Sequence, residues 1–353
     1  MPVTKLAAQW PSVAATALIG AAGGAVFEWF GFPAGWMSGA MIAVAIAALA
    51  RIPVGMPDMV RNALFIALGL SMGAGVTPEV VDRIGQWPWT MAGLIGAVAM
   101  VTGATYIFLH SVMGWSRMTA YFGAIPGALS FVMAMASERR ADLPRIAGAQ
   151  STRLLILVAI LPLVLTSGAQ QPLADVTPQV LTPLPMAIVL AVLCTVASVV
   201  AVRIGLPGGW MTGAFFMSSI LNATNLVTVA LPDAVLVPCY IGLGCLIGSR
   251  FAAMPLIVFL KVLLVGLGAV SVGLAVSVGL AFLLSSVLGL PFGQVLLAYA
   301  PGGLEVMTLL AFMMDLDPAF VAAHQLARYI GMVLLLPFVT GLLLGRTDRT
   351  DDD

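Results

Sequence analysis

The sequence contains very little charge. Of its 353 residues, 8% are Asp, Glu, Lys or Arg, whereas 61% are hydrophobic. Soluble domains carry about 25% charged residues, so this chain cannot cover a globular surface with polar side chains. Its apolar residues form long unbroken runs rather than the alternating pattern of barrel strands. We therefore predict an all-α integral membrane protein, because a spanning helix satisfies its own backbone hydrogen bonds.

Residues that typically bind metals or nucleic acids are also scarce. The chain has three cysteines, two histidines and a formal net charge of zero. Cys194, Cys239 and Cys245 lie within apolar segments without metal-type spacing, so we predict buried thiols and no disulfide framework. The absence of a basic cluster argues against a nucleic-acid partner. We predict no metal site and no cofactor, and we expect the lipid bilayer to surround most of the chain.

The apolar segments fall into two groups of six. A proline-containing linker at 168–183 separates a first membrane repeat at 1–167 from a second at 184–345, and a polar tail follows at 346–353. The first apolar run lacks the short core and cleavage site of a signal peptide, so we expect it to be a membrane helix. The predicted segments lie at about 12–30, 34–50, 62–76, 88–110, 119–137, 145–167, 184–203, 208–222, 234–249, 254–286, 291–314 and 320–345.

The two groups are related by an internal duplication. GFPAGWMSGA at Gly31–Ala40 returns as GLPGGWMTGA at Gly205–Ala214, with seven of ten positions identical. Beyond one inserted residue, matching positions lie 175 apart. These pairs are Gly69 with Gly244, Gly73 with Gly248, Pro126 with Pro301, Gly127 with Gly302, Gln150 with Gln325, Arg153 with Arg328 and Pro162 with Pro337. Such duplication is typical of transporters, whose substrate site lies at the repeat interface.

Loop charges predict that the repeats are inverted. Arg139, Arg140 and Arg145 place their loop inside by the positive-inside rule, whereas the matching loop carries Asp315 and Asp317 without Lys or Arg. Inversion requires an odd number of spans in each repeat, so one of the six segments must not cross. We predict about ten spans plus two re-entrant segments, and the third and fifth segments of each repeat are both candidates for the re-entrant one.

The fifth segment of each repeat contains a helix breaker. Pro126-Gly127 interrupts the first, and Pro301-Gly302-Gly303 interrupts the second. Breaks at membrane depth are tolerated where they line a cavity or are buried in protein. The helix N-terminus that each break frees favours anions. Because two breaks occur at matched positions, we predict that both line a functional site rather than being simple kinks.

The sixth segments each place a glutamine and an arginine deep in an apolar run. Gln150 and Arg153, like Gln325 and Arg328, are three residues apart and share a helix face. Each arginine lies near the bilayer centre, where it costs at least about 2.5 kcal/mol unless it meets a partner or water. Two roles are open. The arginines bind an anionic group such as a carboxylate, or they hold the carbonyl ends of the neighbouring broken helix.

Two further groups are candidates for proton coupling. Glu305 in the second broken helix stands opposite Ser130 in the first. It either pairs with Arg328 or carries a proton. His324, beside Gln325, could shuttle protons near neutral pH, although a lone buried histidine is more often satisfied locally.

The repeated GxPxGWMxGA segment has a packing role in our interpretation. Proline starts a helix, and small residues such as Gly35, Gly39 and Ala40 allow another helix to approach closely. Ser38 and Thr212 are secondary candidates for lining the site.

These motifs resemble those of the membrane AbrB-duplication family. The paired GxPxGWMxGA segments, AIPGALS, APGGLEVM, AQSTRL and HQLARY carry the resemblance over nearly the whole chain. Family labels include "regulator" and "ammonia monooxygenase". The family is similar to the sodium/proton antiporter, bile-acid and glutamate symporter group, which implies inverted repeats, crossing broken helices and elevator-type transport. The antiporters' acidic pair is not apparent, because Ser130 stands opposite Glu305, and this argues against simple cation/proton exchange.

Our hypothesis is a secondary active transporter of a small organic anion, coupled to H⁺ or Na⁺, in the bacterial inner membrane. A homodimer is expected by analogy. The alternatives are a membrane protein that affects gene expression indirectly, a channel, or a membrane oxygenase. Because metal oxygenases need clustered ligands and the only histidines are His110 and His324, we predict no enzymatic activity. The predicted substrate-binding residues are Pro126, Gly127, Ser130, Gln150, Arg153, Pro301, Gly302, Gly303, Glu305, Gln325 and Arg328.

Overall fold

The computed structural model describes residues 10–76, 85, 87–127, 129–139, 141–167, 182–224, 226–227, 229–252 and 254–344. Within these ranges the chain is helical and contains no strand. The polar tail and residues 168–181 of the predicted linker lie outside the described residues.

Helices cover all twelve predicted segments. The first half contains α2 (Trp10–Trp29), α3 (Gly35–Leu49), α4 (Asp58–Gly73), α6 (Trp87–Ile107), the π-helical turn η2 (Phe108–Val112), α7 (Arg117–Ala124), α8 (Leu129–Glu138) and α9 (Leu143–Ser167). The second half contains α10 (Leu184–Arg203), α11 (Gly209–Ala223), α12 (Asp233–Gly248), the 3₁₀ turn η3 (Ser249–Phe251), α13 (Leu256–Leu288), α14 (Phe292–Tyr299), α15 (Leu304–Met313) and α16 (Pro318–Leu344).

Seven helices of the described chain are long and apolar enough to cross a membrane, which makes this a multi-pass membrane protein. They are α2, α6 with η2, α9, α10, α12 with η3, α13 and α16. The predicted number of about ten spans is therefore higher than the number of helices of spanning length. The difference arises because α3, α4 and α11 have 15 or 16 residues. Such helices reach about 23 Å, which is less than the bilayer core of about 30 Å.

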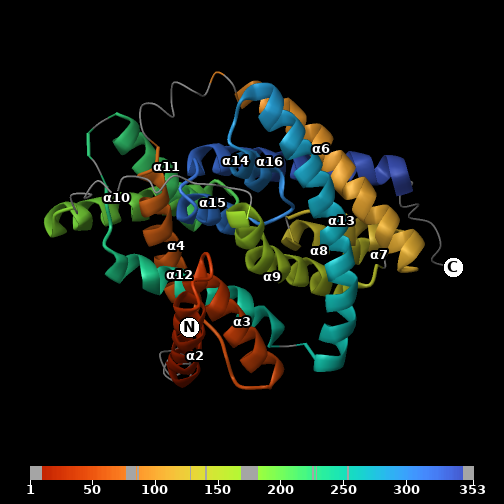
Figure 1. The fold of residues 1–353 in the computed structure, drawn as a ribbon, viewed down its shortest axis with the longest axis horizontal. Coiled ribbons are helices and arrows are strands. Elements are labelled where there is room, and N and C mark those ends of the chain that lie inside the picture. The colour runs from red at the N-terminus through yellow and green to blue at the C-terminus, as the bar shows by residue number, and fades with distance from the viewer. Residues whose placement is uncertain are drawn as a thin grey trace.

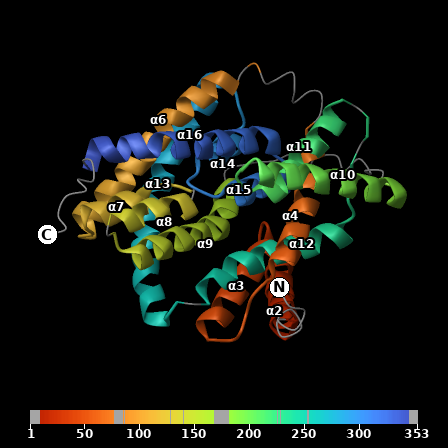
Figure 2. The ribbon, with the colours of Figure 1, turned by 180° about the vertical axis from the view of Figure 1, so that it is seen from behind.

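The helices form two packing groups. One contains α2, α3, α4, α10, α11 and α12, and the other contains α6 to α9 and α13 to α16 (Figure 1). The view from behind shows the same division (Figure 2). The groups meet mainly where α9 lies against α3 and α12, and where α4 lies against α15 and α16. Each group contains helices from both halves of the sequence, so the sequence halves are not the packing units.

Within the first group, helices of one half pack on helices of the other. A Cβ added to Gly69 of α4 would lie 2.4 Å from the Met211 carbonyl oxygen of α11. A Cβ added to Gly244 of α12 would lie 2.4 Å from the Met37 carbonyl oxygen of α3. The matched glycines thus allow two equivalent backbone contacts between the halves.

The repeated motif also packs as predicted. A Cβ on Gly39 of α3 would lie 2.2 Å from the Gly23 carbonyl oxygen of α2. A Cβ on Gly213 of α11 would lie 2.5 Å from the Ser198 Cα of α10. The expectation of close helix packing at both copies of GxPxGWMxGA is therefore confirmed.

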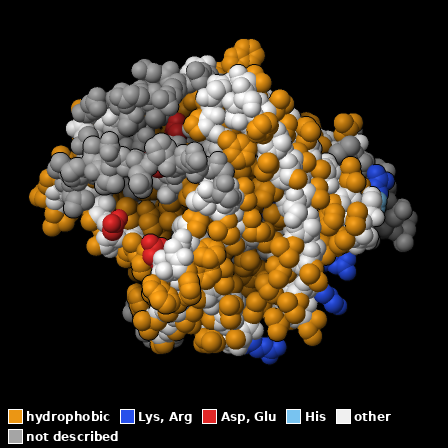
Figure 3. Space-filling view, viewed as in Figure 1, with side chains coloured by type: hydrophobic (Ala, Val, Ile, Leu, Met, Phe, Trp, Pro, Cys, Tyr) orange, Lys and Arg blue, Asp and Glu red, His pale blue; other side chains and the backbone are white. Residues whose placement is uncertain are grey.

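Apolar side chains dominate the face shown in Figure 3, and its charged side chains lie towards the edges. This outward apolar surface is what lipid requires.

The predicted buried thiols are confirmed, because Cys194, Cys239 and Cys245 are free and buried.

Candidate functional site

Both fifth segments are broken where the Pro-Gly pairs predicted. In the first half, α7 ends at Ala124, Ile125 is extended and Gly127 has a φ of 95°. In the second half, α14 ends at Tyr299 and Ala300 is extended, before α15 begins at Leu304. Proline cannot continue the hydrogen-bond ladder, and Gly127 adopts a φ that most residues avoid. We call these two interruptions, at 125–127 and 300–303, the first and second breaks.

Arg328 of α16 holds the second break. Its Nη1 donates a 2.6 Å hydrogen bond to the Ala300 carbonyl oxygen, and its Nη2 donates to the Gly302 carbonyl oxygen. Arg328 is 5% exposed, so both bonds are shielded from water. Its Nε has no partner among the described residues. The predicted structural role, in which an arginine holds the carbonyl ends of a broken helix, matches this geometry.

Arg153 of α9 makes fewer bonds at the first break. Its Nη1 donates a 3.2 Å hydrogen bond to the Ile125 carbonyl oxygen, and no other bond from this guanidinium is formed within the described residues. Arg153 is 8% exposed, and its Nε is buried without a partner. The repeat-related arginines therefore differ in how many of their N–H groups remain available.

The two glutamines differ in a similar way. Gln325 Nε2 donates a 2.8 Å hydrogen bond to the Leu297 carbonyl oxygen at the end of α14, and its Oε1 is buried without a partner. Gln150 is 4% exposed, and its Nε2 has no partner within the described chain. Unpaired buried polar atoms are uncommon in folded proteins. Their presence here suggests that this region accommodates a ligand or water.

The second-half arginine also reaches the first break. Arg328 Nη2 lies 3.8 Å from the position that a Cβ on Gly127 would occupy. The guanidinium groups of Arg328 and Arg153 are close enough to repel each other. Within the described residues, no carboxylate lies within 4.0 Å of either arginine. The two breaks thus meet at a buried, positively charged centre.

Glu305 lies elsewhere, so the predicted pairing with Arg328 is not formed. Its Oε1 lies 2.9 Å from the position of a Cβ on Gly208, beside Thr212 at the start of α11. Glu305 also interacts electrostatically with Arg250 of η3. It sits on α15, whose first turn points this carboxylate across the interface between the two packing groups rather than towards α16. Ser130 lies in α8, and its side chain is outside the described set.

His324 is locally satisfied. It is completely buried, with Nδ1 at 2.7 Å from the Phe320 carbonyl oxygen and Nε2 at 2.8 Å from the Thr90 hydroxyl. Tyr299 donates a 2.6 Å hydrogen bond to the Thr90 carbonyl oxygen, which connects α6 to the end of α14. His324 therefore helps to fix the second broken helix against its neighbours.

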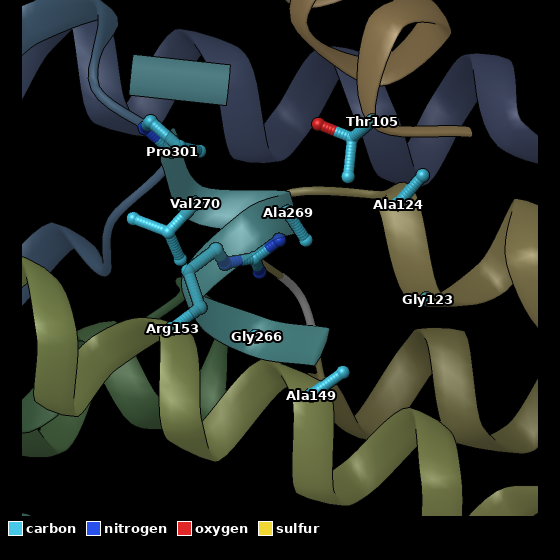
Figure 4. Close-up of a pocket in the computed structure, with 9 residues that line it drawn as sticks. All are labelled: Thr105, Gly123, Ala124, Ala149, Arg153, Gly266, Ala269, Val270 and Pro301. Carbon is cyan, nitrogen blue, oxygen red and sulfur yellow. The ribbon is translucent and has the colours of Figure 1, made fainter. Parts of the chain in front are cut away.

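A pocket lies beside the first break (Figure 4). Its walls come from α6, α7, α9, α13 and the second break, and the guanidinium of Arg153 points into it. The enclosed part of this pocket is small, with room for about one water molecule, and the pocket is partly open. Pro301 and Arg153 both line it, so predicted residues from the two halves do meet in one pocket.

Sequence reasoning missed the contribution of two helices. Thr105 of α6 and Gly266, Ala269 and Val270 of α13 line the pocket. The run GLGAVSVG at 266–273 contains the relevant signal, because small residues in a membrane helix mark a face that another element approaches. This stripe of small residues, which lies outside the Pro-Gly segments, indicates that α13 closely approaches another element.

Comparison with known proteins identifies the family of this chain. The profile described as "Transition state regulatory protein AbrB" matches residues 36–344. The chain belongs to the AbrB family. The resemblance in the repeated motifs is thereby confirmed.

Two bacterial relatives are similar over most of their length. A protein of Escherichia coli (strain K12), provisionally named regulator AbrB, is 26% identical over 322 residues, which cover 87% of this chain and 89% of the relative. The uncharacterized protein YhjN of Bacillus subtilis (strain 168) is 26% identical over 349 residues, with 90% of each chain covered.

Proposed function

We propose that this AbrB-family protein is a secondary active transporter of a small organic anion. The observation that carries the proposal is the pair of buried guanidinium groups, Arg153 and Arg328, at the meeting point of two broken helices. No described carboxylate neutralises them. A buried charge without a partner is costly, and arginine matches a carboxylate with paired hydrogen bonds. An anionic solute supplies the missing negative charge.

We also propose that the two halves form inverted repeats. Matched glycines in α4 and α12 make equivalent contacts with α11 and α3. Matched breaks in the fifth segments each bond to the arginine of the following helix. Inverted repeats with discontinuous helices at the centre are a common transporter design. These equivalences support a single ancestral unit used twice.

An elevator-type mechanism is consistent with the division of the fold. The group with α6 to α9 and α13 to α16 contains both breaks and both arginines, whereas the other group contains none of them. Limited contact between two compact groups permits relative movement. In this proposal the group with both breaks carries the solute, and the group with α2, α3, α4, α10, α11 and α12 anchors the protein in the membrane.

H⁺ or Na⁺ is the proposed coupling ion. Glu305 is the better placed candidate for proton coupling, because it is half-buried at the interface between the packing groups and has no ion-pair partner within 4.0 Å in the described chain. His324 is already bonded through both ring nitrogens. We place the protein in the bacterial inner membrane, where a homodimer is the expected assembly.

The test starts with ligand binding by the purified wild-type protein in detergent. The panel contains organic acids, amino acids, ammonium and sugars, each with and without sodium. A ligand that binds only the folded state raises the melting temperature. At a concentration of 100 times its Kd, it increases the free energy of unfolding by about 2.7 kcal/mol. We expect at least one organic anion to stabilise the protein and to be taken up by proteoliposomes against its gradient.

The matched control is on the same helix. Arg145→Gln removes an exposed arginine of α9 that forms a 3.1 Å ion pair with Asp142 at the surface. It should leave anion binding unchanged, whereas Arg153→Gln should weaken it by about 10- to 100-fold. If only neutral or cationic compounds stabilise and are transported, the proposal of anion transport is wrong.

A further inference from the structure

We infer that Arg153 alone recognises the solute charge, and that the solute is a short-chain monocarboxylate bound in the pocket between α7, α9 and α13. This inference rests on the proposed transport function and specifies its substrate class. Three observations carry it: the unequal bonding of the two arginines, the single charge in the pocket lining and the small size of the residues that form its walls.

The first observation concerns the available N–H groups. A guanidinium has five N–H donors. Arg328 uses both of its terminal nitrogens on carbonyls of the second break. Arg153 uses only Nη1, on Ile125. Its Nε and Nη2 edge therefore has two parallel donors free, and this is the edge that binds a carboxylate through two hydrogen bonds.

The second observation concerns charge. Arg153 is the single ionisable side chain in the pocket lining. Thr105 adds a hydroxyl that makes no hydrogen bond with any described residue, and its side chain lies at the upper edge of the pocket in Figure 4. The remaining walls are apolar. The second carboxylate of a dicarboxylate would meet Val270 and Ala269, and the ammonium of an amino acid would find no acid, so both are disfavoured.

The third observation concerns size. Gly123, Ala124 and Ala149 form one side of the pocket, and Gly266 and Ala269 form the other. The alanine side chains on both sides are short, whereas a Cβ added to Gly123 or Gly266 would meet Trp115 or Thr152. The enclosed space has room for about one water-sized group. A bound carboxylate must therefore have a short chain that extends to the open side of the pocket, where each buried methylene gains hydrophobic stabilisation.

The experiment measures binding and uptake of a graded series of anions. The probes are acetate, propionate, butyrate, hexanoate, succinate, alanine and chloride. The variants are Arg153→Gln, Arg153→Lys, Thr105→Val and Ala269→Leu. Ala275→Leu is the matched control, because it makes the same substitution at an exposed position of α13.

The expected result is saturable binding of short monocarboxylates, with little competition from succinate or alanine. Arg153→Gln should weaken binding by about 10- to 100-fold, as expected for loss of a charge-assisted hydrogen bond. Arg153→Lys should recover only part of it, because lysine lacks the fork. Ala269→Leu should weaken butyrate more than acetate, whereas Ala275→Leu should match wild type.

Four results would overturn the inference. Succinate binding as tightly as propionate would show that the pocket accepts two charges, and transport of organic anions would still stand. Chloride as the one ligand would indicate an inorganic anion site. Unchanged affinity in folded Arg153→Gln would remove the assigned residue. If no anion binds wild type, the proposed function fails together with the inference.

Discussion

Two arginines at equivalent sequence positions have different surroundings. Arg328 bonds to two carbonyl oxygens of the second break, whereas Arg153 bonds to one carbonyl oxygen of the first. In the duplication that we propose, the same residue occurs twice, and the neighbouring segments give each copy different hydrogen-bond partners. We interpret Arg328 as a residue that stabilises the break and Arg153 as a residue that binds the solute.

This difference predicts unequal effects on stability. Arg328→Gln leaves the Ala300 and Gly302 carbonyls without their arginine donors in a buried site. Each unpaired buried group costs about 1–3 kcal/mol. We expect Arg328→Gln to lower the melting temperature in detergent more than Arg153→Gln does, because the latter frees one carbonyl.

Thermal unfolding followed by tryptophan fluorescence checks this prediction. Arg145→Gln again serves as the control, since a surface ion pair contributes about 0–1 kcal/mol. Equal losses in the two buried variants, or a larger loss for Arg153→Gln, would contradict the assigned roles.

At the level of elements, glycines determine which helices touch. Gly69 and Gly73 of α4 face α11, and Gly244 and Gly248 of α12 face α3. A side chain at any of these positions would separate two backbones. The helix pairs that connect the two halves therefore depend on the absence of side chains rather than on specific polar contacts.

Gly69→Ala and Gly244→Ala should destabilise the protein to a similar degree. The new Cβ would lie 2.4 Å from a carbonyl oxygen in both cases, so the backbones must move apart. Overpacking of this kind costs about 1–3 kcal/mol. Gly96→Ala in α6 is the matched control, because no atom lies within 4 Å of the added Cβ.

Melting temperatures of the three variants provide the measurement. The control should equal or exceed wild type, since alanine favours helix by about 1 kcal/mol over glycine. A large difference between Gly69→Ala and Gly244→Ala would indicate that the two contacts are not equivalent, and would weaken the case for repeats.

At the level of the whole molecule, the fold separates into a group that holds both breaks and a group that holds the repeated GxPxGWMxGA helices. Two features lie where the groups meet. One is Glu305, and the other is a 3.3 Å hydrogen bond from the Ser38 hydroxyl to the Val158 carbonyl oxygen. Transport by relative motion would change this interface first. Because few residues contact each other across this interface, the relative motion in our proposal would break few contacts.

Inversion of the repeats predicts opposite exposure of matching loops. Ser137→Cys and Asp315→Cys each introduce a thiol at an exposed position near the ends of α8 and α15. The native cysteines are buried and should react little. A membrane-impermeant maleimide added to intact cells should label Asp315→Cys but not Ser137→Cys, and permeabilised cells should label both.

Labelling of both thiols from one side would contradict inversion and would require parallel repeats. Labelling in permeabilised cells is the control for the intrinsic reactivity of each thiol. The result is independent of the solute, so it tests the architecture even if the substrate class is wrong.

Much of the local structure was predictable because its causes are local. Long apolar runs specify membrane helices, and Pro126 and Pro301 break their segments wherever those segments pack. The repeated glycines also predicted close approach, since a missing Cβ has the same effect at every helix contact. Burial of Arg153 and Arg328 followed from their position deep in apolar runs.

The sequence by itself determined the helices, the two breaks and the buried arginines. Tertiary structure alone decided their partners. Pairing with Arg328 was one of two roles predicted for Glu305, which instead faces Gly208 and Thr212. The pocket wall comes partly from α13, which carries no polar motif. Partner choice depends on how helices distant in sequence are placed side by side, and helical periodicity within one segment contains no information about that placement.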